Sequence, residues 1–280
     1  MKAPDFRYER PGSLGDALAL LADDSVEATP IAGGQSLMPM MNFRMAAPEV
    51  LVDLGALTEL QGISASGGWL EIGAMTRYRD LAASEEVARH APLMARALPH
   101  VAHPAIRNRG TLGGSVALAD PAAEMPAVLL ALGGEIVLHG PAGQRTVAAD
   151  DFFTGLYQTT REENELVTAI RVPCAAEGAR AGFHELARRH GDYAMAGCCV
   201  AASGDLAQVR IALFAVSDRP VRAAGAEIAL AGSDGGPEAL AGAVAALETL
   251  DFDGDINAAP ETKRHLAGVA LTRAWKEVTR

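Results

Sequence analysis

The sequence contains few of the side chains that build disulfides and metal clusters. Its 280 residues include three cysteines, which are Cys174, Cys198 and Cys199. Three cysteines can build neither a disulfide framework nor the four-cysteine ligand set of an iron–sulfur cluster. His100 and His103 stand three residues apart, but Pro104 disfavours a helix at His103 and no third ligand is near. We therefore expect no metal site, and an iron–sulfur cluster serving this protein must lie on another chain.

Long apolar runs and an excess of basic charge are also absent. No apolar stretch approaches the ~18 residues that a membrane helix needs, and the first residues lack the pattern of a signal peptide. We therefore expect no integral membrane segment and a cytoplasmic location. The formal net charge of −11 argues against nucleic acid as a partner, because nucleic acids select for basic patches. A hydrophobic fraction of 49% is ample for the packed core of one large domain or two.

Two glycine-rich stretches, residues 31–37 (IAGGQSL) and 107–115 (RNRGTLGGS), carry the strongest functional signal. Paired glycines beside hydroxyl residues can expose backbone N–H groups to a pyrophosphate. Neither stretch has the spacing of a Rossmann or P-loop motif. One pair alone would more often be an ordinary turn, but two pairs together favour a phosphate site. We expect valine at Gly34 or Gly113 to block cofactor binding while leaving the protein folded.

The second stretch is followed by a predicted helix start. Asp120 suits an N-cap and Pro121 suits the first helical position, before the apolar residues 125–132. A helix N-terminus next to a glycine loop strengthens the prediction of an anion site.

At these residues the chain resembles the FAD-binding medium subunits of the molybdenum hydroxylases. This group contains carbon monoxide dehydrogenase, xanthine dehydrogenase and bacterial N-heteroaromatic hydroxylases. Residues 32–41 match the family pattern A-G-G-(H/Q)-S-L-x-P-x-M, and residues 106–114 match I-R-N-x-x-T-x-G-G, with Ser115 in the place of an asparagine. Further matches, in the family's order, are residues 120–123, 165–173, 189–194 and 218–222.

The resemblance implies that the cofactor is FAD and indicates which residues bind it. These residues are Ile31, Ala32, Gly33, Gly34, Gln35, Ser36, Ile106, Asn108, Thr111, Leu112, Gly113, Gly114, Ser115, Glu124, Val167 and Tyr193. Glu124 stands where many relatives carry an aspartate, and Tyr193 matches an aromatic that lies beside the isoalloxazine in some members. For Val167 and Tyr193 a purely structural role, as a core valine and a strand aromatic, is an equally good interpretation. No residue of this chain is expected to be catalytic.

The order of elements predicts an α+β protein. The resemblance implies a two-subdomain FAD-binding domain of the p-cresol methylhydroxylase type over residues 1–174, with subdomains of about 1–58 and 59–174. Residues 175–280 resemble the C-terminal domain of carbon monoxide dehydrogenase flavoproteins. We expect three antiparallel strands there, at residues 183–187, 194–202 and 209–216, followed by helices that end with residues 261–278.

The function implied is that of an FAD-binding electron-transfer subunit in a heterotrimeric molybdenum hydroxylase. A large subunit would carry the molybdenum cofactor and a small subunit the two-iron two-sulfur clusters, and the assembly would be a dimer of heterotrimers. Electrons from those clusters would reach FAD here and leave to an external acceptor. An autonomous flavin oxidase or reductase of the same FAD fold is the main alternative, and a non-enzymatic nucleotide-binding module is another.

Overall fold

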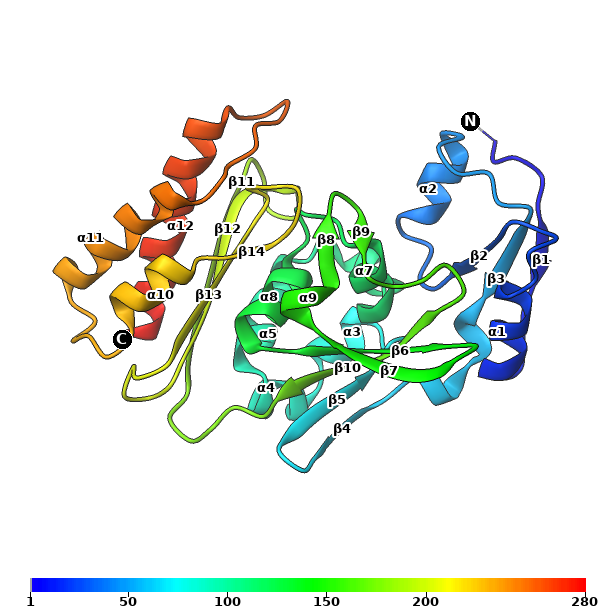
Figure 1. Ribbon diagram of the computed structural model, residues 1–280, viewed down its shortest axis with the longest axis horizontal. Coiled ribbons are helices and arrows are strands. Elements are labelled where there is room, and N and C mark those ends of the chain that lie inside the picture. The colour runs from blue at the N-terminus through cyan, green and yellow to red at the C-terminus, as the bar shows by residue number, and fades with distance from the viewer. Residues whose placement is uncertain (1) are drawn as a thin grey trace.

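A computed structural model describes residues 2–280, which form three regions along the chain, each built on its own sheet (Figure 1). The first sheet is parallel, in the order β1-β3-β2, and its strands are β1 (Arg7–Glu9), β2 (Ala28–Ile31) and β3 (Val50–Asp53). Helix α1 (Leu14–Leu21) begins after Ser13, whose hydroxyl accepts a hydrogen bond from the Asp16 N–H, as its N-cap position predicts. Helix α2 is Leu37–Asn42.

The second region contains a five-stranded antiparallel sheet in the order β4-β5-β10-β6-β7. Its strands are β4 (Ile63–Ser66), β5 (Trp69–Gly73), β6 (Glu135–Gly140), β7 (Gly143–Ala148) and β10 (Leu166–Pro173). The helices are α3 (Tyr78–Ala82), α4 (Glu85–His90), α5 (Pro92–Ala97), α6 (Pro104–Arg107), α7 (Leu112–Leu118), α8 (Glu124–Leu132) and α9 (Ala149–Phe152). Short 3-10 helices are η1 (Leu54–Ala56), η2 (Thr58–Leu60) and η3 (Leu98–His100), and β8 (Phe153–Gly155) pairs with β9 (Gln158–Thr159).

The third region is a four-stranded antiparallel sheet, where the sequence predicted three strands. Its order is β11 (Arg180–Ala187), β12 (Ala194–Ala202), β13 (Val209–Phe214) and β14 (Val221–Arg222). The fourth strand has two residues, too few to show the alternation on which a strand prediction depends. The helices are α10 (Ala224–Leu230), α11 (Pro237–Ala246), η4 (Leu247–Thr249) and α12 (Pro260–Val278). The α+β class is confirmed.

Apolar side chains on opposite faces of the third sheet join two different cores. Cys198, Ile211 and Leu213 pack with the helices of their own region, where α12 covers β11 and β12 and α10 covers β13. Phe183 and Phe214 point the other way and join the core of the second region, where α5 and α8 cover that face (Figure 1). The second and third regions are therefore joined by a continuous apolar core.

The helix predicted at Asp120 begins later in the structure. Helix α8 starts at Glu124 after Ala123, and the Asp120 carboxylate instead accepts a hydrogen bond from the Ala122 N–H (2.9 Å), which closes a turn. The N-cap beside the second glycine pair is Thr111, whose hydroxyl accepts from the Gly114 N–H (3.1 Å). That glycine pair thus lies inside the first turn of α7.

Within residues 2–280, no helix combines the length and the apolar character that crossing a membrane requires. The same residues contain no group of three histidine, cysteine, aspartate or glutamate side chains placed to hold a metal ion.

Candidate functional site

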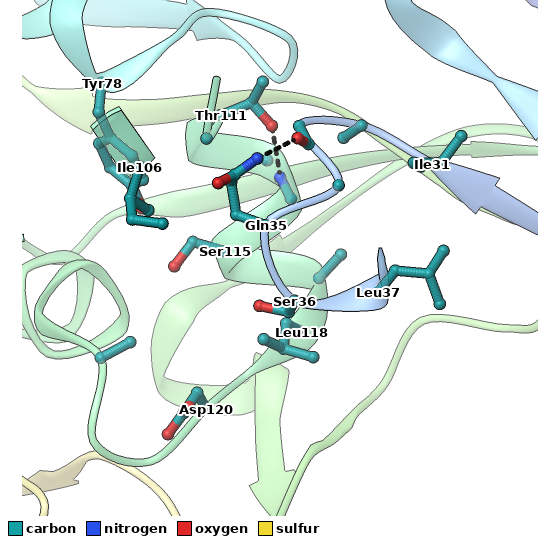
Figure 2. A pocket seen from close by; sticks show the side chains of 18 of the residues that line it. Ile31, Gln35, Ser36, Leu37, Tyr78, Ile106, Thr111, Ser115, Leu118 and Asp120 are labelled. Atoms are coloured by element: carbon teal, nitrogen blue, oxygen red, sulfur yellow. Dashed lines mark hydrogen bonds between the residues drawn. The ribbon is translucent and has the colours of Figure 1, made fainter. Parts of the chain in front are cut away.

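A cavity of about 580 Å³ lies where the two glycine stretches meet (Figure 2). It receives side chains from all three regions, including Ile31 of the first, Tyr78 of the second and Tyr193 of the third. Of the residues predicted to bind the cofactor, all except Asn108 and Leu112 line it. Asn108 is exposed at the end of α6, and Leu112 is fully buried in the core.

Glycines allow the two stretches to touch. A Cβ on Gly33 would meet the Arg109 carbonyl oxygen and would lie 2.8 Å from Gly110 Cα. A Cβ on Gly114 would lie 2.9 Å from the Thr111 hydroxyl and 3.3 Å from the Ala32 Cβ. Segments about eighty residues apart in the sequence therefore pack backbone against backbone, which side chains would prevent.

The first stretch offers free hydrogen-bond donors. Within the described chain, the backbone N–H groups of Gly33, Gly34, Gln35 and Ser36 donate to no protein acceptor. Gly34 has a φ of 70°, and the Gln35 amide donates to the Gly33 carbonyl oxygen (2.9 Å), which fixes the turn. Figure 2 shows the Ser36 hydroxyl directed into the pocket beside these groups. A row of unsatisfied N–H groups is an anion-binding surface.

Around its glycine pair, at residues 112–115, the second stretch does not offer such donors, which differs from the sequence interpretation. The Leu112 and Gly113 N–H groups donate to the carbonyl oxygens of Thr76 (3.1 Å) and Ala74 (2.8 Å), and Gly114 donates to its N-cap. A Cβ on Gly113 would not enter the cavity freely, because it would meet the Ala74 Cβ and lie 2.7 Å from the Ala74 carbonyl oxygen. This stretch contributes the Ser115 hydroxyl and a closely packed wall.

Two tyrosine hydroxyls lie near Asp120, which Figure 2 shows at one end of the cavity, and of these two residues Tyr193 lines the cavity whereas Tyr157 does not. Tyr193 directly precedes β12 and is 72% exposed, so it is not the buried strand aromatic of the structural interpretation. Tyr157 donates to the Asp120 carboxylate at 3.5 Å. Burial raises the pKa of Asp120, and desolvation followed by the charge of Asp120 raises the pKa of Tyr193 to about 12. Val167, by contrast, is 6% exposed and both lines the cavity and packs in the core.

Two polar groups deep in the cavity wall lack strong protein partners. Burial raises the pKa of Glu124 to about 7, with a smaller contribution from the charge of Glu185. The hydroxyl of Tyr78 is buried without a hydrogen-bond partner among residues 2–280, although Ser115 lies near it. A buried, unpartnered hydroxyl in a cavity wall fits a site that a polar ligand completes. No sequence motif indicated Tyr78.

Comparison with known proteins identifies the family of the domains that form the cavity. Residues 4–175 match the family described as the FAD binding domain in molybdopterin dehydrogenase, and residues 181–278 match the CO dehydrogenase flavoprotein C-terminal domain. The chain belongs to the FAD-binding medium subunits of the molybdenum hydroxylases. These subunits are components of oxidoreductases.

Similar medium subunits match this one over nearly their whole length. The carbon monoxide dehydrogenase medium chain of Hydrogenophaga pseudoflava is 41% identical over 98% of this chain and 97% of its own. The nicotine 6-hydroxylase medium subunit of Paenarthrobacter nicotinovorans is 40% identical over 99% and 98%. Among solved structures, carbon monoxide dehydrogenase from H. pseudoflava has a TM-score of 0.96 at 41% identity, covering 99% of this chain and 98% of that one. Quinoline 2-oxidoreductase from Pseudomonas putida 86 has a TM-score of 0.94 at 39% identity, covering 100% and 98%.

The residues of this medium subunit fit FAD as the cofactor. FAD carries an anionic diphosphate, which matches the free N–H groups of the first stretch and the Ser36 hydroxyl. Its many hydroxyl and ring acceptors match the unpartnered Tyr78 hydroxyl. The cavity volume lies within the range of ordinary cofactor sites.

Proposed function

We propose that this medium subunit transfers electrons through FAD, from iron–sulfur clusters of a small partner subunit to an external acceptor. Substrate oxidation would take place at a molybdenum cofactor on a large partner subunit. The flavin supplies the redox chemistry when it is bound, and the chain holds the cofactor and controls access to it. The observation that carries the proposal is an FAD-family cavity with an exposed aromatic, Tyr193, at one end.

The similarity to two medium subunits, over nearly their whole lengths, supports a role as a subunit. The relatives are described as a medium chain and a medium subunit, and this protein covers 97% and 98% of their lengths. The region after β10 is accounted for by the same C-terminal domain as in the CO dehydrogenase flavoprotein. An autonomous flavin enzyme would need a substrate site in addition to the flavin site. The features of the cavity described above fit the cofactor itself.

We assign the cavity residues to FAD in an extended arrangement. The first glycine stretch would bind the diphosphate, and the Tyr193 end, with Glu124, would hold the isoalloxazine where a partner can approach it. The predicted residues that line the cavity would all contact or position the cofactor. The domain division at residues 174 and 175, the dimer of heterotrimers and the cytoplasmic location stay predictions.

An anaerobic titration tests the division of labour. The full-length chain, loaded with FAD, is mixed with candidate substrates of molybdenum hydroxylases while the flavin absorbance is followed. We expect no bleaching by any substrate until the two partner subunits are added, and substrate-dependent bleaching afterwards. A nicotinamide donor serves as a control that the flavin can be reduced. Stoichiometric bleaching of the chain by a substrate in the absence of partners would contradict the proposal and support an autonomous flavin enzyme.

A further inference from the structure

Arg161 is a cavity residue that neither glycine stretch nor any family motif indicated. It lies between β9 and β10, on a segment that extends toward the first sheet (Figure 1). Among the described residues that line the cavity, it is the only arginine or lysine. A single cation in a cavity that also contains Asp120 and Glu124 is therefore the natural partner for an anionic part of the ligand.

The hydrogen bonds of Arg161 leave part of its guanidinium free. Its Nη1 donates to the backbone carbonyl oxygens of Glu162 (2.7 Å), Glu163 (3.3 Å) and Glu165 (2.8 Å). Its Nε and Nη2 have no hydrogen-bond partner in the described chain. Neither nitrogen is fully buried without a partner, so both can be reached by a ligand. The carbonyls thus hold the side chain in place while two N–H-bearing nitrogens remain available.

The charge of Arg161 is not neutralised by a protein carboxylate. The carboxylate of nearby Glu165 accepts two hydrogen bonds from Arg145, from Nε and Nη2, each 2.7 Å long. Arg161 itself has no carboxylate within ion-pair distance in the described chain. Burial lowers the pKa of Arg161, but an arginine stays protonated at neutral pH. A partly buried guanidinium that has no ion-pair partner, and that only the more distant charges of Glu165 and Glu163 stabilise, is costly unless a ligand completes it.

We propose that Arg161 binds the ADP half of FAD and makes the cavity select FAD over FMN. The inference rests on the proposed arrangement of FAD, with the isoalloxazine at the Tyr193 end. Arg161 lies beside Leu166, which packs with Leu54 and Met75 against the first sheet, whereas Tyr193 comes from the third region. The diphosphate and adenosine would therefore lie toward Arg161. A guanidinium suits phosphate oxygens and ribose or adenine acceptors, and FMN lacks the second phosphate, the adenosine ribose and the adenine of FAD.

Binding measurements on the full-length chain, freed of flavin, test this assignment. Dissociation constants for FAD, ADP, adenosine and FMN are measured by calorimetry with the wild type, Arg161→Gln and Arg161→Lys. For Arg161→Gln we expect FAD and ADP affinity to fall about 10- to 100-fold, because charge-assisted hydrogen bonds are lost, and FMN affinity to stay unchanged. Arg161→Lys should lose less than Arg161→Gln. A parallel loss for adenosine would place the contact on the nucleoside, and an unchanged adenosine affinity would place it on the phosphates.

Arg145→Gln is the matched control. Arg145 supports the same segment through the Thr160 carbonyl oxygen (2.6 Å) and Glu165, but it does not line the cavity. If Arg145→Gln weakens ADP binding as much as Arg161→Gln does, segment order explains the effect and the proposal is wrong. Unchanged ADP affinity in Arg161→Gln, or a loss confined to FMN, would also overturn it. A wild-type chain with no affinity for FAD or ADP would refute the proposed FAD arrangement together with this inference, whereas normal FAD binding by both the wild type and Arg161→Gln refutes only the inference.

Discussion

The substitution Gly113→Ala should destabilise this protein even though it lies in a helix, where alanine is normally favoured. The new Cβ would lie 2.7 Å from the carbonyl oxygen and 2.8 Å from the Cα of Ala74, which are backbone atoms that cannot rotate away. Overpacking of this kind costs about 1–3 kcal/mol. A shift of the helix to relieve it would weaken the hydrogen bond from Gly113 N–H to Ala74 (2.8 Å), worth about 1 kcal/mol.

The gain in helix propensity offsets part of this cost. Replacing glycine by alanine contributes up to about 1 kcal/mol in a helix interior. We therefore expect a net loss of about 1–3 kcal/mol, which corresponds to a decrease in Tm of roughly 2–5 °C for a chain of 280 residues. The sequence alone suggested that valine at Gly113 leaves a folded protein that cannot bind FAD, but Gly113 faces Ala74, so the first effect of any side chain at this position should be on stability.

Gly114→Ala provides the comparison within the same helix. Its Cβ would meet the Thr111 hydroxyl at 2.9 Å and the Ala32 Cβ at 3.3 Å. Rotating the Thr111 side chain relieves the shorter contact at the cost of the cap hydrogen bond but without moving backbone, so the loss in Tm should be smaller than for Gly113→Ala. Thermal unfolding followed by circular dichroism, in the absence and presence of FAD, measures both variants. A Gly113→Ala protein with the Tm of the wild type would show that Ala74 yields readily. The close-packing argument would then be wrong, and a direct phosphate role for Gly113 would be the better explanation.

Three further predictions concern Glu124, Tyr193 and the pair of His100 and Glu185. Burial raises the pKa of Glu124 to about 7, so the folded protein binds this proton more tightly than the unfolded chain does. The resulting stabilisation is complete below the unfolded pKa and is lost as the pH rises through 7. The Tm of Glu124→Gln, which does not titrate, should therefore rise relative to that of the wild type between about pH 4.5 and 8. Tyr193→Ala should shift the flavin absorption spectrum. Because the side chain is mostly exposed, the free energy of unfolding should change by less than about 0.5 kcal/mol. An unchanged spectrum would argue against contact with the flavin. Glu185→Gln should lower the pKa of His100, which the hydrogen bond to Glu185 raises, and an unchanged NMR titration of the His100 ring would refute that cause.

The glycine stretches show how much of a binding site a local motif can predict. The sequence predicted that both stretches meet at one cavity, and the structure brings together all but Asn108 and Leu112 of the residues indicated by the resemblance. It did not predict that the two stretches differ in kind. Whether an N–H group is free depends on which carbonyls from elsewhere in the chain reach it, and Ala74 and Thr76 reach only the second stretch.

The starts of α7 and α8 also depend on more than the local sequence. Asp120 and Thr111 both have side chains that can cap a helix, and Asp120 is followed by a proline that suits the first turn. The structure uses Thr111 as the cap and Asp120 to close the turn before α8. Both residues satisfy a backbone N–H within three positions, so local chemistry alone does not separate a cap from a turn, and the packing of α7 against Ala74 decides.

Tyr78 and Arg161 mark the limit of what this sequence reveals about its own site. Each is a single residue in an unremarkable local context, and each owes its role to a tertiary environment: a core that surrounds the Tyr78 hydroxyl without a partner, and three carbonyls that hold one side of the Arg161 guanidinium. A cofactor cradle made of backbone N–H groups needs a specific chain conformation and so leaves a motif. A contact made by one side chain depends only on where the fold places that residue, so it leaves no sequence motif and is recognised from the structure.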